Sequence, residues 1–204
     1  MIQPVMITCP GREEKLSETL ASLCASDWPV TECAVIVRLD DSQAERRQER
    51  QEQNARAALR LGYDSGAPYV MFLEDDLEFN RHIWHNLTRW DPLHRGVLDM
   101  GSLYNPNIHM IETDDVENWT IADPGSVYGS QAYVLSRRAV DYVTQRWAEV
   151  LAMQDIKISR LVAQMGSPIY YHYPSLVQHT GTVSAWGTNY FHTARDFKAD
   201  WRSS

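Results

Sequence analysis

Apolar residues gather into short runs along the first half of the chain, and each run ends at a turn or at acidic residues. Runs of this length, rich in β-branched and aromatic residues, predict β-strands. Leucines at helical spacing over 16–23 and a charged, helix-prone segment over 43–66 predict the helices between them. The three predicted strands are Val5–Thr8, 33–39 and Tyr69–Leu73. Alternation of strands and helices in this order is typical of a parallel sheet covered by helices.

The second half of the chain has a less regular pattern. Its apolar runs predict strands over 97–103 and 132–135, and Ser136 is a candidate N-cap for a helix that follows the later strand. A further helix is expected over 154–165, because Gly166 stops the pattern there.

Two polar segments are expected to hold little structure of their own, namely 105–125 and the tail after Arg195. The aromatic residues over 168–191 indicate a segment that folds over a site. Neither half contains a repeat or a convincing linker, so the 204 residues predict a single α/β domain with a mostly parallel sheet.

Polar and acidic residues follow each of the first three predicted strands. The groups are Thr8-Cys9-Pro10, Asp40-Asp41 and Glu74-Asp75-Asp76. Parallel sheets bind ligands beyond the carboxyl ends of their strands, so these groups are expected to converge. Three adjacent carboxylates repel one another when buried, so this motif indicates either a cation site or a solvated acidic turn. Mg²⁺ or Mn²⁺ suits such oxygen ligands, because substrate phosphates can complete the coordination.

Composition narrows the function classes. The formal net charge of −8 disfavours a general attraction to nucleic acid or an anionic membrane. The three cysteines show no paired spacing, which disfavours a zinc knuckle or a disulfide framework and favours free thiols in a reducing compartment. No apolar run is long enough to span a membrane and no signal peptide is visible, so we expect a cytoplasmic location.

The stretch YVMFLEDDLEF, residues 69–79, resembles the strand and D-x-D-type motif of GT-A nucleotide-sugar glycosyltransferases. This resemblance implies that Asp76 is a ligand of Mn²⁺ or Mg²⁺ and that Asp75 lies beside the metal or the donor ribose. Glu74 matches the E-D-D variant of some N-acetylglucosaminyltransferases.

Four further stretches resemble the same family in the same order. MITCPGREEKLSETLASL is similar to the strand, loop and helix that cradle the nucleobase, and VRLDDS is similar to the end of the second strand. GSQAYVLSRRAV resembles the segment that lines the sugars, and YPSLVQHTGTVSAWG is similar to a stretch of branching N-acetylglucosaminyltransferases. The resemblance implies that His179 is another ligand of the metal or the diphosphate. The candidate donor-binding residues are Thr8, Pro10, Arg12, Asp40, Asp41, Glu74, Asp75, Ser130, Gln131 and Trp186. Arg12 is included because a cation after the first strand suits a phosphate or the base, and Trp186 either stacks on the sugar or belongs to the core.

An inverting enzyme of this family needs a base that takes the proton of the acceptor hydroxyl. In the family this base is typically an Asp or Glu at the start of a helix, after the acceptor segment, and Asp155 in MQDIKISRL matches that position. The alternative is a helix-capping role for Asp155. Asp141 is a weaker rival, because its place inside RRAVDYV favours a solvent-facing side chain.

The resemblance implies a nucleotide-sugar-binding half over 1–104 and an acceptor and catalytic half over 105–204. We expect a hexosyl- or N-acetylhexosaminyltransferase that uses a nucleotide sugar, first of all a UDP-sugar. The small size indicates a bacterial or phage enzyme, whose acceptor is a glycan, a lipid-linked sugar, a protein or a modified DNA base. Two alternatives stay open: a nucleotidyltransferase, although its glycine-rich basic loop is absent, and a non-catalytic sugar-binding domain.

Overall fold

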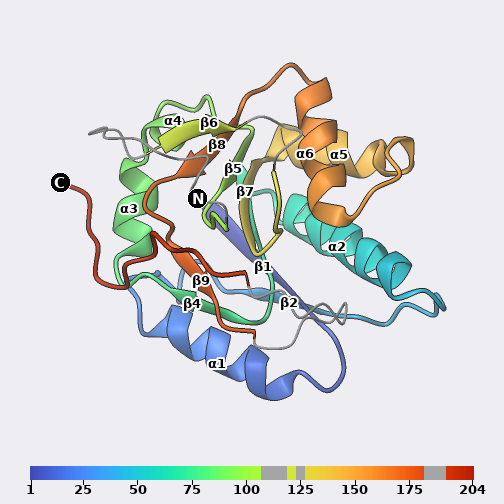
Figure 1. Ribbon diagram of the computed structural model, residues 1–204, viewed down its shortest axis with the longest axis horizontal. Helices are drawn as coiled ribbons and strands as arrows, with labels where there is room; N and C mark the ends of the chain where they lie inside the picture. Colours follow the sequence, from blue (N-terminus) through green and yellow to red (C-terminus); the bar gives the residue numbers. More distant parts are fainter. Residues whose placement is uncertain (107–118, 123–126, 182–191) are drawn as a thin grey trace.

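The computed structural model describes residues 1–106, 119–122, 127–181 and 192–204, and for 119–122 only the backbone. A seven-stranded sheet forms its centre, in the order β2-β1-β3-β7-β5-β8-β6 (Figure 1). The strands are β1 (Ile2–Thr8), β2 (Ile36–Leu39), β3 (Tyr69–Leu73), β5 (Met100–Ser102), β6 (Trp119–Ala122), β7 (Ala132–Ser136) and β8 (Ile169–His172). The helices are α1 (Glu13–Cys24), α2 (Arg47–Asp64), α3 (Ile83–Arg89), α4 (Asp91–His94), α5 (Arg137–Gln145) and α6 (Gln154–Gln164), with a 3₁₀ turn, η3 (Trp147–Glu149).

Strand direction confirms the predicted α/β fold with a mostly parallel sheet. β1 pairs in parallel with β2 and β3, and β5 pairs in parallel with β8. β7 is antiparallel to both β3 and β5, so β5 and β8 run in the same direction as the first three strands. β6 closes the far edge antiparallel to β8.

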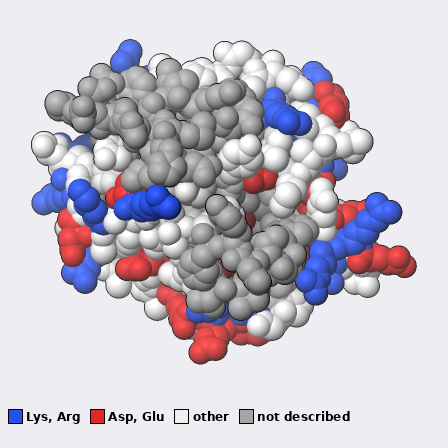
Figure 2. Space-filling view, in the orientation of Figure 1, with Lys and Arg blue, Asp and Glu red and all other residues white. Residues whose placement is uncertain are grey.

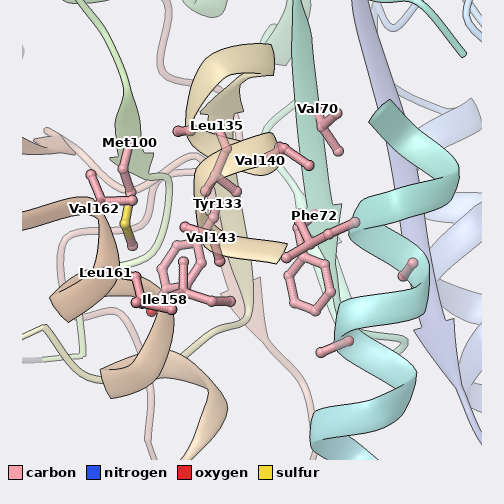
Figure 3. Packing of buried hydrophobic residues seen from close by; sticks show 14 of the residues in the cluster. Val70, Phe72, Met100, Tyr133, Leu135, Val140, Val143, Ile158, Leu161 and Val162 are labelled. Atoms are coloured by element: carbon pink, nitrogen blue, oxygen red, sulfur yellow. The ribbon is translucent and has the colours of Figure 1, made fainter. Parts of the chain in front are cut away.

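Side chains alternate between two cores, one on each face of the sheet. Val70 and Phe72 of β3 point into a core shared with α2, α5 and α6, while Met71 and Leu73 point into the other core, which α3 also lines. Figure 3 shows the first core, in which Phe72 lies near α2. Each fully buried side chain of this size contributes about 1.5–3 kcal/mol relative to an exposed one. Because both faces are covered, β3 is apolar throughout and not alternating.

A second, two-stranded sheet sits beside the main one. β4 (Leu77–Phe79) pairs antiparallel with β9 (Val177–His179), with Leu77 opposite His179. The tight connection from β3 to β4 contains all three acids of the E-D-D motif. The small sheet therefore carries the histidine of the C-terminal half to the acids of the N-terminal half.

Parts of two segments that were expected to hold little structure form defined contacts. Within 105–125, residues Trp119–Ala122 form strand β6, because the edge of β8 offers unpaired backbone groups. In the tail after Arg195, Asp196 accepts hydrogen bonds from the backbone N–H and hydroxyl of Ser175. Such contacts have no periodicity, so the hydrophobic pattern could not reveal them.

Side-chain amides fasten the rest of the tail to α3 and to the turn that precedes it. The amide of Asn80 donates to the carbonyls of Lys198 and Trp201, and the amide of Asn86 donates to the carbonyl of Trp201.

None of the helices in the described part of the chain combines the length and apolarity that crossing a membrane requires.

His172 at the end of β8 gives the folded state a dependence on pH. Its ring is fully buried, with centroids 5.2 Å from Trp90 and 5.6 Å from Trp201. Burial disfavours the charged form and lowers the pKa of His172 from 6.5 to about 4, although a hydrogen bond to the Pro174 carbonyl opposes this. The folded-state pKa lies below that of the unfolded chain, so the unfolded chain takes up a proton first as the pH falls. The stability linked to neutral His172 is therefore complete above about pH 6.5 and is lost between about pH 6.5 and 4.

His172→Gln removes this titration. Between about pH 7 and pH 4.5, the wild-type protein should lose about 2 kcal/mol more of its free energy of unfolding than the variant does. Urea denaturation at the two pH values measures the difference, with His94→Gln, at an exposed position, as the matched control. A wild-type protein and a His172→Gln variant with parallel pH dependence would show that His172 is not buried in its neutral form.

Candidate functional site

The three acids of the E-D-D motif lie inside the protein. Asp75 is 4% exposed and Asp76 is 5% exposed, and Glu74 is partly buried beside them. A solvated acidic turn would leave these carboxylates in water, so that alternative does not describe them. Buried carboxylates need partners that offset the lost hydration.

Arg12 is the main cationic partner of Asp75 and Asp76. Its Nε donates to both carboxylate oxygens of Asp75, at 2.8 and 2.9 Å, and its Nη2 lies 2.7 Å from Asp75 Oδ1 and 2.6 Å from Asp76 Oδ2. The hydroxyl of Thr8 also donates to Asp75. Gly11, with a φ of +87°, allows the tight turn that brings Arg12 back over the end of β1. The hydrogen bond to Asp75 raises the pKa of Arg12 further.

His179 approaches Asp76 from the other side. Its Nε2 lies 3.2 Å from Asp76 Oδ2, and its Nδ1 lies 3.2 Å from the carbonyl oxygen of His192. Burial alone would raise the pKa of Asp76, but the hydrogen bond to His179 and the charges of His179 and Arg12 hold it below its ordinary value. Burial alone would lower the pKa of His179, because it disfavours the charged imidazolium, but the hydrogen bond to Asp76 raises this pKa above its ordinary value.

Backbone contacts hold this pair at close range. Thr180 N–H donates to the carbonyl oxygen of Asp76 at 2.8 Å, directly after the β4–β9 ladder. A Cβ at Gly181 would lie 2.4 Å from Asp76 Oδ2 and 2.7 Å from His179 Nε2. Only glycine therefore lets the chain pass this close to both side chains.

Thr19 of α1 supports the loop that carries the three acids, residues 74–76, called the acid loop below, and sequence reasoning missed it. Its hydroxyl donates to the carbonyl oxygen of Asp75 at 2.8 Å and accepts from the N–H of Leu77 at 2.9 Å. The side chain is 1% exposed. A threonine on a polar helix carries no sequence signal for such a role, because the contact spans the fold.

Glu74 faces a different neighbourhood, made by β7 and α6. Its Oε1 accepts from the Ser130 hydroxyl at 2.7 Å and from Gln154 Nε2 at 3.2 Å, and Gln154 Nε2 also donates to Ser130 Oγ at 2.6 Å. Burial and the charge of Asp76 raise the pKa of Glu74 to about 7. The N–H of Glu74 donates to the carbonyl of Gln131. Gln154 is a second residue that sequence reasoning missed, since its neighbour Asp155 carries the recognisable signal.

Asp155 occupies the first turn of α6. Its Oδ2 accepts from Gly129 N–H at 2.9 Å and its Oδ1 accepts from Ile156 N–H at 2.8 Å. The carboxylate thus joins α6 to the segment just before Ser130. Each oxygen keeps a further lone pair, so both the structural and the chemical role of Asp155 are compatible with this geometry.

Two of the remaining predicted residues, Asp40 and Pro10, lie next to the end of β1. Asp40 accepts from Arg50 and from Ser42 N–H, and its own N–H donates to the Thr8 carbonyl, which places it next to the end of β1. Pro10 is exposed in the turn after β1.

Two acidic candidates pair with arginines other than Arg12. Asp41 is 75% exposed and pairs with Arg38. Asp141 of α5 pairs with Arg60 of α2. Trp186 lies outside the described residues.

Several buried polar atoms near the acids have no hydrogen-bond partner among the described residues. They are Asp76 Oδ1, Gln131 Oε1, Gln154 Oε1 and the hydroxyls of Tyr104 and Tyr133. Burial and the charges of Glu74 and Asp76 raise the pKa of Tyr104, which places its hydroxyl in the field of the acids. A buried polar group without a partner costs about 1–3 kcal/mol, so this set favours a ligand that offers many hydrogen bonds.

The site residues fit one divalent cation with few protein ligands. Asp76 Oδ2 and His179 Nε2 are 3.2 Å apart, close to the ~3.0 Å between neighbouring ligands of an octahedral ion with ~2.1 Å bonds. Among the described residues no group of three or more His, Cys, Asp and Glu side chains is arranged to hold a metal. Asp75 is already held by Thr8 and Arg12, so Asp76 and His179 are the residues here that could hold a metal, with phosphate and water to complete its shell.

Comparison with solved structures identifies the architecture of the chain. The chain is similar to the mannosyltransferase PcManGT from Pyrobaculum calidifontis in complex with GDP-Man and Mn²⁺, with a TM-score of 0.54 and 13% identity over 82% of this chain and 53% of that one. It is also similar to GalNAc-T7 with UDP, GalNAc and Mn²⁺, with a TM-score of 0.59 and 11% identity over 88% of this chain and 43% of that one. This is the GT-A fold. A197 from STIV is similar too, with a TM-score of 0.55 and 10% identity over 87% of this chain and 84% of that one.

The GT-A fold predicted from the sequence is thereby confirmed. The chain spans about half the length of the first two structures, at 53% and 43%. The likeness of YPSLVQHTGTVSAWG to branching N-acetylglucosaminyltransferases finds no support in these structures and stays a prediction. No family model and no curated protein matches the chain.

Thr19→Val tests the support of the acid loop. The change keeps the shape of the side chain but leaves the Asp75 carbonyl and the Leu77 N–H buried without their partner. We expect a loss of about 2–4 kcal/mol in the free energy of unfolding, measured by urea denaturation. Thr88→Val is the matched control, because Thr88 is exposed and bonds only within α3. Equal effects of the two changes would contradict the role of Thr19.

Proposed function

We propose that this protein is a metal-dependent glycosyltransferase, which moves a sugar from a nucleotide-sugar donor to a hydroxyl acceptor with inversion at the anomeric carbon. The observation that carries the proposal is the pair of Asp76 and His179, 3.2 Å apart at the carboxyl edge of parallel strands in a GT-A fold. Two structures of this fold were solved with Mn²⁺ and with nucleotides or nucleotide sugars, which supports the same ligand class here.

The donor nucleotide is assigned to the half formed by residues 1–104. The loop with Thr8, Pro10 and Arg12 faces the acids, and the backbone of Asp40 is bonded to the Thr8 carbonyl. We propose that this edge binds a UDP-sugar, with Asp40 and Asp41 toward the base. Mn²⁺ or Mg²⁺ held by Asp76 and His179 would offset the negative charge of the diphosphate leaving group.

The transferred sugar is assigned to the neighbourhood of Glu74. Ser130 and Gln154 hold one oxygen of Glu74, and the amide oxygens of Gln131 and Gln154 lack partners among the described residues. A hexosyl or N-acetylhexosaminyl group carries hydroxyl and amide donors that match these acceptors. Because leaving such groups unpaired is costly, they can reject sugars that lack a matching donor.

Asp155 is the proposed base of the acceptor half, residues 105–204. Two backbone N–H groups fix its carboxylate in place and leave a lone pair on each oxygen for the hydroxyl proton. The acceptor's proton then passes to Asp155 while its oxygen forms the new bond to the anomeric carbon and the bond to the diphosphate breaks.

The acceptor class follows only in part from charge. Figure 2 shows basic and acidic side chains mixed around the visible face, without one extended basic surface. Together with a net charge of −8, this disfavours a modified base in DNA. A glycan, a lipid-linked sugar or a protein is the proposed acceptor.

The metal requirement is tested by thermal unfolding with a panel of nucleotide sugars. With Mn²⁺, the matching donor at about 100 times its Kd should stabilise the protein by about 2.7 kcal/mol. Excess EDTA or Asp76→Asn should remove this stabilisation, whereas Asp64→Asn, at an exposed position on α2, should keep it. Full donor-dependent stabilisation in EDTA would rule out a metal-dependent enzyme.

Asp155→Asn tests the base. Proton abstraction belongs to the transition state, so kcat should fall about 10²–10⁴-fold while the Kd of the donor changes little. Asp141→Asn is the matched control and should keep wild-type turnover. NMR of the product should show an anomer inverted relative to the donor. Retained turnover in Asp155→Asn would return the residue to a structural role, and a product with the donor's configuration would require a different mechanism.

A further inference from the structure

Arg12 lies where a cation at Asp76 would compete with it. Its Nη2 is 2.6 Å from Asp76 Oδ2, the same oxygen that His179 Nε2 faces at 3.2 Å. A divalent ion bound between Asp76 and His179 would share that oxygen with a guanidinium at hydrogen-bond distance. Two positive centres on one carboxylate oxygen repel each other strongly in a buried site.

Arg12 has a second anchor that does not depend on Asp76. Its Nε donates to both oxygens of Asp75 at 2.8 and 2.9 Å, and Thr8 and Thr19 hold Asp75 in turn. The Nη2 that contacts Asp76 also lies 2.7 Å from Asp75 Oδ1, and the Arg12 side chain is 26% exposed, so the planar group can pivot as a unit on Asp75 toward solvent. The guanidinium can thus leave Asp76 without leaving Asp75.

We propose that Arg12 and the divalent cation are alternative partners of Asp76, and that the cation sends the Arg12 guanidinium from Asp76 to the diphosphate of the donor. This inference rests on the proposed function, because it assumes a cation at Asp76 and an anionic donor beside it. Arginine pairs readily with phosphate oxygens, so the displaced group gains a new partner when the nucleotide is present.

The exchange makes cation and nucleotide binding cooperative. Without a nucleotide, the cation must displace Arg12 from Asp76, and the guanidinium receives nothing in return. With a nucleotide, the diphosphate accepts the released guanidinium and also binds the cation. Linkage then requires each ligand to tighten the other by the same factor.

Replacing Arg12 distinguishes competition between Arg12 and the cation for Asp76 from a purely structural role of Arg12 in the acid loop. Arg12→Gln leaves Asp75 and Asp76 without their cationic partner, so Mn²⁺ alone should bind about tenfold more tightly than to the wild-type protein, as measured by electron paramagnetic resonance of free Mn²⁺. The factor by which UDP tightens Mn²⁺ binding should fall about tenfold as well. A purely structural role for Arg12 would weaken Mn²⁺ binding, since the acid loop would lose its order.

Two further variants complete the design. Lys15→Gln, which removes a charge from α1 that pairs with Glu18, is the matched control and should leave both quantities unchanged. Arg12→Lys keeps the charge but loses the fork that reaches both acids, so it should shift both quantities in the same direction as Arg12→Gln, by less. This variant decides the question if Arg12→Gln does not fold, as judged by circular dichroism.

The outcomes distinguish the inference from the proposed function. Unchanged or weaker Mn²⁺ binding by the Arg12 variants, with coupling to UDP intact, overturns the competition and leaves the glycosyltransferase proposal standing. Absence of Mn²⁺ binding by every protein, with or without UDP, overturns both.

Discussion

Three carboxylates at the end of a single buried strand are the constraint on which this site depends. The guanidinium of Arg12 reaches both Asp75 and Asp76, and the imidazole of His179 lies against Asp76 from the other side. Elements from distant parts of the chain supply the partners of these acids. The turn at Gly11 aims Arg12, the β4–β9 pairing delivers His179, and Thr19 holds the backbone between the two sheets.

Much of the fold was predictable because its core strands are buried on both faces. Tyr69–Leu73 forms a strand over the predicted range, and Ser136 caps α5 by accepting from Ala139 N–H, as its position after an apolar run indicated. The order of the strands in space and the antiparallel course of β7 could not be predicted, since they depend on pairing between distant segments. Strand β6 and the ordered tail escaped prediction for the same reason.

The candidate site was predictable where chemistry is concentrated in a short motif. Asp76, Asp75, Arg12 and His179 were all named from the sequence and lie together, with His179 Nε2 3.2 Å from Asp76 Oδ2. Thr19 and Gln154 were not predictable, because each is a common polar residue whose role appears only across the fold. The pairing of exposed Asp41 with Arg38 was not predictable either, because the acidic pattern at the strand end does not reveal its partner.

The β4–β9 ladder also sets the order in which the site is completed during synthesis. His179 follows Asp76 by more than a hundred residues, so a ribosome exposes the acid strand long before it exposes the histidine. Arg12, by contrast, precedes both acids and is already available when they emerge. The nascent N-terminal half therefore already contains a cationic partner for its carboxylates, and it gains the second arm of the site only when the last strand docks.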